Sequence, residues 1–526
     1  MENRNVSKNL DENIQWWKAA FSDCADIKML EMSLGEDMSV RTFLTYIEIT
    51  GGESMLEKRP LGRLLTSLPR LPRQDVLRKM RKNGMGVSDA VPFATMQEAA
   101  DGLLAGECIL FFDGFDRAIK IPDKGYPAMS LQEVESEKSV RGSNERFSNS
   151  VKQNAALIRK RIRSSDVKVQ EQKVGVRSGT NLYLVYYDGL IYPEFLEEME
   201  RRLKSFTIDG VQDIGVVQQL SEKYWYSPFP QFQVTERPDR AAMALLEGRM
   251  VVLLDNSPEA LIFPTDYNSF IKTTDDYYSR WEIASFTRIL RYVASFFAMV
   301  LPGLYLAVTN FHTQILPTKL LLSFAAARQG VPFPGVIEVL LMELSFELLR
   351  EAGVRLPDAM GNTIGIVGGL IIGQAAVDAN IVSPMVVIIV AFTALCSFAI
   401  PNEDFAAAFR LLKFVFIGLC AAWGYYGFLI GLLFVLIHLA QLESFGMPYF
   451  TPFVGADLSK NADVRDTFVR PPSELLKRRP VYANKNNRVR LRVGDQSHTP
   501  GRSGKAVIRF IKSDSGKNQV RKRSME

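Results

Sequence analysis

Cysteine and histidine are scarce in this sequence of 526 residues. The four cysteines, Cys24, Cys108, Cys396 and Cys420, are far apart and form no CxxC pair. Their spacing predicts neither a disulfide framework nor a zinc site. Of the three isolated histidines, His438 lies in an apolar run, where simple packing is favoured over a role as a proton relay. We therefore expect no metal, no haem and no other cofactor.

Catalytic and nucleotide-binding motifs are missing as well. No GxxxxGK[ST] or GxGxxG loop follows a predicted strand, so nucleotide binding has no basis in the sequence. There is also no Gly-x-Ser-x-Gly elbow and no paired Cys and His nucleophile. Asp113-Gly114 and Asp255-Asn256 each follow a predicted strand, and such pairs are typical of tight turns. We expect that the protein is not an enzyme.

Long apolar runs are absent before Tyr292, and the first residues lack the basic-then-apolar order of a signal peptide. Residues 292–442, in contrast, are almost all apolar. The last 75 residues, 452–526, hold 18 Lys or Arg against 7 Asp or Glu. This partition predicts a soluble region, then a membrane domain, then a basic tail.

The soluble region contains an internal repeat. LLAGECILFFDGFDRAI, from residue 103, matches LLEGRMVVLLDNSPEAL, from residue 245, with Gly106 and Asp113 equivalent to Gly248 and Asp255. Upstream, DIKMLEMSLGEDMSVRTFLTYIEITG resembles DVKVQEQKVGVRSGTNLYLVYYDG at nearly the same offset. Two matches at one offset indicate a duplicated unit. Strand-like and helical stretches alternate within it, which predicts two small α/β subdomains.

The predicted fold class is therefore multi-domain, with two duplicated α/β subdomains followed by an all-α, polytopic membrane domain and a tail. The expected parts are an α/β subdomain at 1–138, a basic helical linker at 139–165, a second α/β subdomain at 166–285, a helical transmembrane domain at 286–451, and a basic, partly disordered cytoplasmic tail at 452–526.

The linker carries a short apolar stripe, Leu157, Ile158 and Ile162, on an otherwise basic helix. Basic helices bind nucleic acids or membrane surfaces in many proteins. Few aromatic residues accompany the basic ones here, which argues against a nucleic-acid partner. We expect a solvated helix that bridges the two subdomains.

The membrane domain divides into about five or six spans, since about 20 apolar residues cross a bilayer. The run 414–442 is too long for one crossing, and WGYYG in its middle predicts a break. Small-residue spacing in GGLIIGQAA favours close helix contacts. The other expected spans are 292–311, 333–351, 361–377 and 381–400. Residues 311–330 are alternatively a helix at the membrane interface.

Basic residues near the span ends predict the orientation. Six crossings place the N-terminal domain, the tail and most of these residues on the cytoplasmic side, with Lys319 and Arg328 as exceptions outside. The residues placed inside are Arg288, Arg291, Arg350, Arg355, Arg410 and Lys413.

One predicted span, within PGVIEVLLMELSFELLREAG, carries five charges: Glu338, Glu343, Glu347, Arg350 and Glu351. At about 100° per residue, the last four fall within one arc of about 100°, and Glu338 lies off it. Four lipid-facing charges cost roughly 10 kcal/mol or more, so this face must meet water or protein. Three arrangements remain open: a helix lining an aqueous cation path, an amphipathic helix at the interface, or charges paired within a bundle.

The combination of motifs resembles the A subunit of GerA-type spore germinant receptors. The resemblance covers about residues 26–480, and its most specific segments are PFPGVIEVLLMELSFELLREAGVRLPDAMG, VGGLIIGQAAVDANIVSPMVVIIVAFTALCSFAIPN, TERPDRAAMALLEGRMVVLLDNSPEALIFP, DDYYSRWEIASFTRILRY and HLAQLESFGMPYFTPF. One departure occurs in VRGSNERF, where Arg141, Gly142 and Phe147 match the family but Ser143 replaces its usual proline.

The resemblance implies a non-enzymatic, multi-pass protein of the spore inner membrane. It further implies a transporter-like B subunit that senses the nutrient, a C-subunit lipoprotein, and a homo-oligomer, a pentamer, that forms a germinant-gated ion channel. The charged residues of 334–353 are then the pore-facing or partner-facing stripe. The tail is expected to touch anionic membrane lipids. A secondary transporter and a non-conducting signalling scaffold remain the alternatives.

Overall fold

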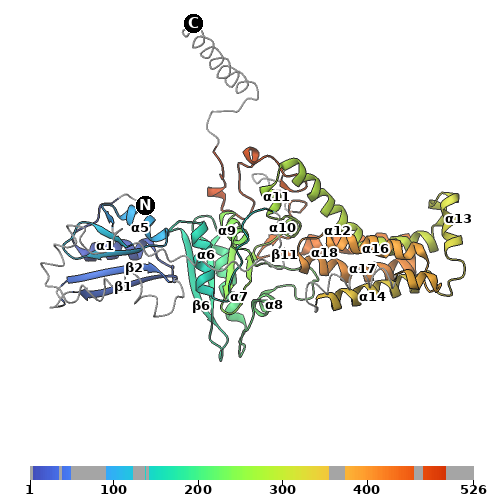
Figure 1. Cartoon of the computed structure of the whole chain (residues 1–526), viewed down its shortest axis with the longest axis horizontal. Helices are drawn as coiled ribbons and strands as arrows, with labels where there is room; N and C mark the ends of the chain where they lie inside the picture. The colour runs from blue at the N-terminus through green and yellow to red at the C-terminus, as the bar shows by residue number, and fades with distance from the viewer. Residues whose placement is uncertain are drawn as a thin grey trace, which may run out of the picture.

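The computed structural model describes residues 4–34, 38, 40–48, 91–121, 137, 141–354, 373–454 and 466–492. The molecule is elongated (Figure 1), with the first α/β subdomain at one end, the second in the middle and a helical bundle at the other end. The chain passes through these three bodies in sequence order, and residues 466–492 then return to the middle one.

The first subdomain is an antiparallel five-stranded sheet in the order β1-β2-β4-β5-β3. Helices α1 and α5 cover one face, where Trp17 packs with Phe43 and Phe111. The alternate residues Leu44, Leu110 and Phe112 form a second cluster on the opposite face. Its elements are α1 (Leu10–Ala20), β1 (Ile27–Leu34), β2 (Val40–Ile47), β3 (Val91–Phe93), α5 (Met96–Leu104), β4 (Cys108–Phe112) and β5 (Ala118–Ile121).

The second subdomain repeats this topology, with strand order β6-β7-β9-β10-β8. Each strand of the first sheet has its counterpart at the same position in the second, which confirms the predicted duplication. Helices α7 and α8 cover the face opposite α6 and α9. The elements are α6 (Val151–Arg161), β6 (Val167–Val174), β7 (Thr180–Tyr187), α7 (Pro193–Ser205), α8 (Ile214–Ser221), β8 (Gln233–Thr235), α9 (Pro238–Leu246), β9 (Met250–Leu254) and β10 (Ala260–Phe263).

The two strand-end aspartates hold equivalent helices. Asp113 Oδ1 accepts from the N–H of Leu10 at the start of α1, and Asp255 Oδ1 accepts from the N–H of Val151 at the start of α6. A carboxylate there satisfies a free N–H of the first helical turn. Gly114 and Asn256 follow with φ of 78° and 70°, so the turn interpretation is confirmed.

Helix α6 is the counterpart of α1 and belongs to the second subdomain. Leu157 and Ile158 are buried in its core, so the expectation of a solvated helix is wrong, although α6 does contact the first subdomain as well. The basic residues misled the prediction because they are paired within the protein. Lys160 and Arg161 both contact Glu145. The proposed boundaries between the five parts stay predictions.

A buried ion pair fixes the first subdomain to the second. Arg159 of α6 binds both carboxylate oxygens of Asp26, and the two side chains are 0% and 1% exposed. Beside them, Ala25 N donates to Val169 O at 2.9 Å, and Val169 N donates to Asp23 O at 2.8 Å. The subdomains therefore share backbone hydrogen bonds as well as charge.

The helical bundle follows two short connecting helices. Helix α12 is central and contacts α16, α17 and α18. The connecting helices are α10 (Tyr267–Ile271) and α11 (Asp275–Tyr278), and those of the bundle are α12 (Trp281–Asn310), α13 (Thr318–Ala327), α14 (Gly335–Val354), α16 (Pro384–Phe398), α17 (Glu403–Trp423) and α18 (Tyr425–Gln441).

Within the described ranges, α12 and α17 are long and apolar enough to cross a membrane, and α13, α16 and α18 are shorter apolar helices. Gly424, with φ of 58°, separates α17 from α18, so the predicted break within WGYYG is confirmed. The segment between 311 and 330 forms a 3-10 turn, Thr313–Ile315, and α13. Most of the predicted span 361–377 lies outside the described residues.

Glycines bring α17 and α18 into close contact. A Cβ placed on Gly427 would lie 2.0 Å from Leu419 O, and one on Gly431 would lie 3.0 Å from Phe416 and Leu419 side chains. This Gly-x-x-x-Gly spacing lets two helix backbones approach. The sequence interpretation assigned that role instead to GGLIIGQAA, most of which lies outside the described residues.

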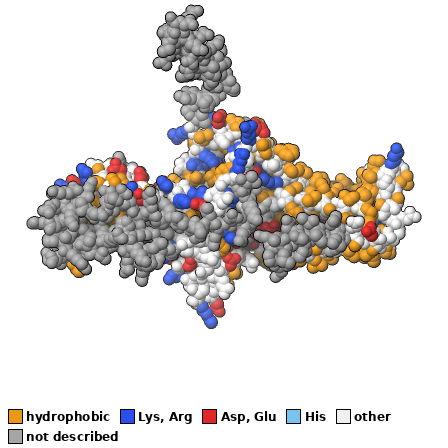
Figure 2. Space-filling view, viewed as in Figure 1, with side chains coloured by type: hydrophobic (Ala, Val, Ile, Leu, Met, Phe, Trp, Pro, Cys, Tyr) orange, Lys and Arg blue, Asp and Glu red, His pale blue; other side chains and the backbone are white. Residues whose placement is uncertain are grey.

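The bundle has two distinct ends. At the far end, Phe311 contacts Gly424, and Gly330 lies against Asn380. At the near end, Ser227 of the second subdomain contacts His438 of α18 at 2.8 Å. Between these ends the lateral surface is apolar (Figure 2), whereas charged side chains gather over the second subdomain. Exposed apolar residues on that lateral surface include Leu344, Leu348, Ile388, Leu395, Leu433 and Phe434.

After α18 the chain returns to the second subdomain. The hairpin β11 (Glu443–Ser444) and β12 (Met447–Pro448) places Phe445 in the second core, with its ring 4.1 Å from that of Phe263. Residues 466–492, with 3-10 turns at Ser473–Leu475 and Lys485–Asn487, then cover the subdomain and bury Tyr482 and Ala483. This part of the predicted tail is therefore docked. Residues 455–465 and 493–526 lie outside the described residues.

Candidate functional site

The charged helix α14 lies against α16, α12 and α17 within the bundle. It begins at Gly335, directly after Pro334, and runs for 20 residues. Its charged side chains divide between the inside of the bundle and its surface. Two of them, Glu338 and Glu343, are 0% and 1% exposed.

Glu343 and Glu347 converge on one cation. Lys413 Nζ of α17 lies 2.6 Å from Glu343 Oε2 and 3.2 Å from Glu347 Oε1. Lys413 and Glu343 are almost fully buried, whereas Glu347 is 26% exposed. A buried carboxylate is stable only when it is paired and hydrogen-bonded, and Lys413 supplies that pairing. The contact also fastens α14 to α17.

Glu338 has a separate structural role at the far end. Its Oε2 accepts from the N–H of Ser383, the residue that precedes α16, at 2.8 Å. Its Oε1 lies 3.2 Å from Arg328 Nη2 in the loop after α13. Glu338 thus holds the first turn of α16 and the loop that leads into α14.

Arg350 and Glu351 lie near the opposite end of α14. Arg350 Nη2 donates to Ser397 Oγ at 2.8 Å, and its guanidinium lies 4.6 Å from the centre of the Phe398 ring. Glu351 is exposed. The structure therefore brings Glu343 and Glu347 together on Lys413 and gives Glu338 and Arg350 other partners. Pairing within the bundle, one of the three arrangements considered, describes Glu338 and Glu343.

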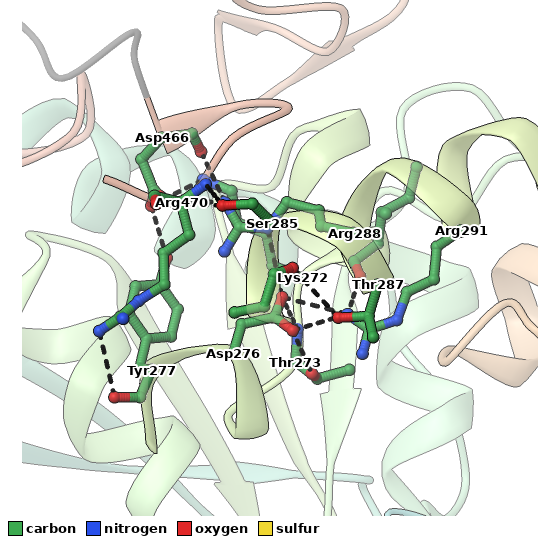
Figure 3. Close-up of polar contacts among 12 residues, drawn as sticks. Lys272, Thr273, Asp276, Tyr277, Ser285, Thr287, Arg288, Arg291, Asp466 and Arg470 are labelled. Carbon is green, nitrogen blue, oxygen red and sulfur yellow. Dashed lines mark hydrogen bonds and ion pairs between the residues drawn. The ribbon is translucent and has the colours of Figure 1, made fainter. Parts of the chain in front are cut away.

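A second polar cluster joins the connecting helices α10 and α11 to α12 and the docked tail (Figure 3). Arg288 of α12 is 0% exposed; its Nε lies 3.2 Å from Asp276 Oδ2 and its Nη1 lies 2.7 Å from Asp466 Oδ1. Arg291 Nη1 adds a 2.9 Å contact to Asp276 Oδ1. We call the residues Lys272, Asp276, Tyr277, Arg288, Arg291, Asp466 and Arg470 the junction cluster.

Asp466 receives several donors in this cluster. Tyr277 OH donates to its Oδ2 at 2.6 Å, and Lys272 Nζ lies 3.2 Å away. Burial alone raises the pKa of Asp466, but Lys272 and Arg288, with the hydrogen bond from Tyr277, bring the pKa below its usual value. Arg470 N donates to Ser285 Oγ at 3.1 Å, which adds a tail contact to α12.

The sequence interpretation missed the junction cluster. Arg288 and Arg291 entered it only as orientation signals, and Asp466 lies 178 residues from Arg288. No local pattern links them. The useful signal was that an arginine at the base of an apolar helix needs a carboxylate partner when it is buried.

A cavity of about 160 Å³ adjoins the junction cluster, between α9, α10 and the docked tail. Arg249 and Tyr482 line it, and the Arg249 guanidinium lies 4.1 Å from the centre of the Tyr482 ring. Asp266, also in the lining, accepts from Ser269 N at 2.9 Å. Arg249 is thus stacked on Tyr482 and Asp266 is bound to Ser269, while the Tyr482 hydroxyl has no hydrogen-bond partner among the described residues. Among the described residues there is no group of three or more His, Cys, Asp or Glu that fits a metal ion.

Comparison with known proteins gives a consistent family. The model of the Bacillus/Clostridium GerA spore germination protein matches residues 15–482. The chain is 36% identical over 486 residues to the uncharacterized membrane protein YfkQ of Bacillus subtilis, covering 92% of this chain and 93% of that protein. It is 36% identical over 485 residues to spore germination protein KA of Bacillus subtilis, covering 92% and 88%.

It is also 40% identical over 388 residues to spore germination protein GerLA of Bacillus cereus, covering 74% of this chain and 78% of that protein. Among solved structures, the crystal structure of the N-terminal domain of the A subunit of the Bacillus megaterium spore germinant receptor GerK3 is similar. The identity is 23% and the TM-score 0.39, covering 50% of this chain and 98% of that one.

Proposed function

This chain belongs to the GerA family of spore germination proteins, and from that membership we propose that it is the A subunit of a nutrient germinant receptor in the spore membrane. The observation that carries the proposal is the family match over residues 15–482, which includes both α/β subdomains, the bundle and most of the docked tail. Relatives named as spore germination proteins support a role in germination. The proposed role is not enzymatic.

The directions of the helices support a multi-pass arrangement. Helices α12 and α17 run from the near end to the far end, and α14, α16 and α18 run back. Residues 373–378 are helical and end at the far end, so a sixth crossing falls largely outside the described residues. The start of α12 and the end of α18 both lie at the near end of the bundle, next to the second subdomain, so we place the soluble parts on one side of the membrane. Arg350 and Arg410 near that end favour the cytoplasmic side.

We propose further that A subunits form a homo-oligomer, a pentamer, around a germinant-gated ion path. A transporter-like B subunit would sense the nutrient, and a C-subunit lipoprotein would complete the receptor. Lys413 neutralises Glu343 within one chain, so Glu343 is poorly placed to select ions. Glu347 is 26% exposed, and Glu351, one helical turn further on, is exposed in the single chain. We assign these two carboxylates to the path, together with Arg350.

The test is potassium release from spores that carry E347Q/E351Q in an otherwise intact receptor. We expect slower release at the same protein level, because the path loses its negative charge. The matched control is E403Q, since the Glu403 side chain is 78% exposed at the start of α17. Release equal to that of E403Q spores would contradict the assignment of these carboxylates.

A non-conducting signalling scaffold is the second candidate, and the internal neutralisation of Glu343 by Lys413 favours it. In that case the bundle transmits a conformational change to its partners and carries no current. Conductance across planar bilayers that contain the reconstituted receptor, with and without germinant, distinguishes the two candidates. Germinant-dependent current supports the channel, and its absence in a germinant-binding receptor supports the scaffold.

A further inference from the structure

The loop after α8, residues 222–230, exposes two large aromatic side chains. Trp225 is 82% exposed and Tyr226 is 63% exposed, although both belong to a well-packed subdomain. Their rings contact each other edge to face, with centroids 6.1 Å apart. Exposing this much aromatic surface to water is unfavourable. Such a pair indicates a surface that something else covers.

The same loop is fixed to the near end of the bundle. Ser227 Oγ lies 2.8 Å from His438 Nε2 of α18, and the Tyr226 ring lies 6.3 Å from the His438 ring. Phe229 stacks on the other side of His438 and is buried in the bundle core. Lys223 lies 3.4 Å from Glu443, just after α18 ends. These contacts hold the exposed aromatic pair at one defined height along α18.

That height is where the apolar lateral surface of the bundle ends. Phe434, one turn before His438, is 70% exposed, and Leu433 beside it is 58% exposed. Trp225 and Tyr226 thus continue the apolar surface from α18 onto the second subdomain. Lys223 adds a cation at the edge of this surface, where a lipid phosphate would meet it.

A matching aromatic group marks the far end of the bundle. Trp423, Tyr425 and Tyr426 surround the α17–α18 turn and are 58%, 38% and 70% exposed. Tyr425 at this turn and His438, which the loop contacts, are 13 residues apart along α18, or about 20 Å at about 1.5 Å per residue. Aromatic groups at the two ends of a helical bundle are typical of the two interfaces of a bilayer.

We propose that loop 222–230 of the second subdomain docks into the headgroup region of the membrane that holds the bundle, with Trp225 and Tyr226 as its anchors. This inference rests on the proposed membrane embedding of the bundle. Because the indole N–H and the phenol O–H prefer the hydrated interface and the rings prefer the acyl boundary, both anchors favour that depth. The docked loop sets the height of the second subdomain above the membrane.

Nitroxide labelling of the full chain in phosphatidylcholine vesicles tests this. The four native cysteines are all buried, so a new exposed cysteine is the main site of labelling. The probe positions are W225C in the loop, W423C at the far turn and V176C on the β6–β7 turn, where Val176 is 72% exposed and away from the bundle. Collision rates with oxygen, enriched in lipid, and with a water-soluble nickel chelate report the depth of each label.

We expect the labels at 225 and 423 to show a several-fold higher oxygen-to-nickel collision ratio than the label at 176. A high ratio at 423 with a ratio at 225 equal to that at 176 would overturn the docking of the loop and leave the embedded bundle intact. Ratios at 423 and 225 both equal to that at 176 would overturn the embedding itself. Low collision rates with both reagents at 225 would mean that protein covers the loop, and would also overturn the proposal.

Discussion

Lys413 of α17 and Glu343 of α14 face each other inside the helical bundle, 2.6 Å apart and almost without solvent contact. The pair joins α14 to α17. It also means that Glu343, one of the two buried acids of α14, is neutralised by its own chain. The stability of variants at these two positions tells whether Glu343 and Lys413 act as a structural ion pair or whether Glu343 is a free charge in a pore.

K413M leaves Glu343 buried without its cation, and breaking a buried pair in this way costs about 3–5 kcal/mol. E343Q costs less, because Lys413 keeps its contact with Glu347. The double variant E343Q/K413M recovers much of the loss, since no buried charge remains at either position. Thermal unfolding of the full chain in detergent measures the stability of all three variants. A double variant as unstable as the sum of the two single variants would show that the pair is not coupled.

R288K weakens the attachment of the tail to α12. The Arg288 guanidinium reaches Asp276 and Asp466 together, and a lysine ammonium lacks the planar fork needed for both. Losing one charged hydrogen bond costs about 1.5–3 kcal/mol. Hydrogen exchange of residues 466–492 is expected to accelerate in R288K. The control is R280K, at an exposed position before the same helix, and equal exchange in both variants would contradict the role of Arg288.

Acid removes part of the stability of the junction cluster through Asp466. Its pKa is lowered in the folded protein, because Lys272 and Arg288 outweigh the effect of burial. A lowered pKa means that the stabilisation is fully present above the ordinary carboxyl pKa of about 3.9, and is lost as the pH falls toward the lower folded value.

At pH 7 the wild-type protein should therefore have a higher melting temperature than D466N. The difference between the two melting temperatures should shrink toward pH 3. D209N is the control, since Asp209 is 78% exposed. Its melting temperature should follow the wild type at every pH. A wild-type advantage over D466N that grows with acidity would have the wrong sign and would refute this assignment.

G427A separates α17 from α18. A methyl group there would lie 2.0 Å from the carbonyl oxygen of Leu419, so the helix backbones must move. Overpacking of this kind costs about 1–3 kcal/mol or more. G418A is matched to it, because a Cβ on Gly418 meets nothing within 4 Å, and alanine gains up to about 1 kcal/mol in a helix interior. Melting temperatures should fall for G427A and hold or rise for G418A.

The duplication and the break within WGYYG could be predicted because each leaves a pattern that is visible in the sequence itself. The repeat keeps its offset in two stretches, and a 29-residue uncharged run exceeds one bilayer crossing. The burial of α6 in the core of the second subdomain could not be predicted in this way. Its basic residues resemble those of a solvated helix, while Asp26, the partner of Arg159, lies 133 residues away.

The charged face of α14 was likewise visible from helical spacing, but its neighbour was not. Spacing tells which side chains share a face of one helix, and it cannot tell which helix that face meets. Lys413 lies 70 residues from Glu343. Its position in the sequence, near the end of a predicted span, indicated only the orientation of that span in the membrane. Long-range pairing of this kind depends on tertiary packing, so it emerges only from the three-dimensional structure.

The docked tail has a mechanical consequence. The chain enters the bundle through α12 and leaves it through α18. Arg288 of α12 binds Asp276 and Asp466, and Phe445, just after α18, packs against Phe263 of the second subdomain. Both helices are therefore attached, at the near end of the bundle, to the second subdomain and the docked tail. A tilt of the second subdomain would move the near ends of α12 and α18 together. We therefore expect little sliding between these two helices at the near end. We expect any relative movement of these two helices to be larger at the far end of the bundle, around Gly424.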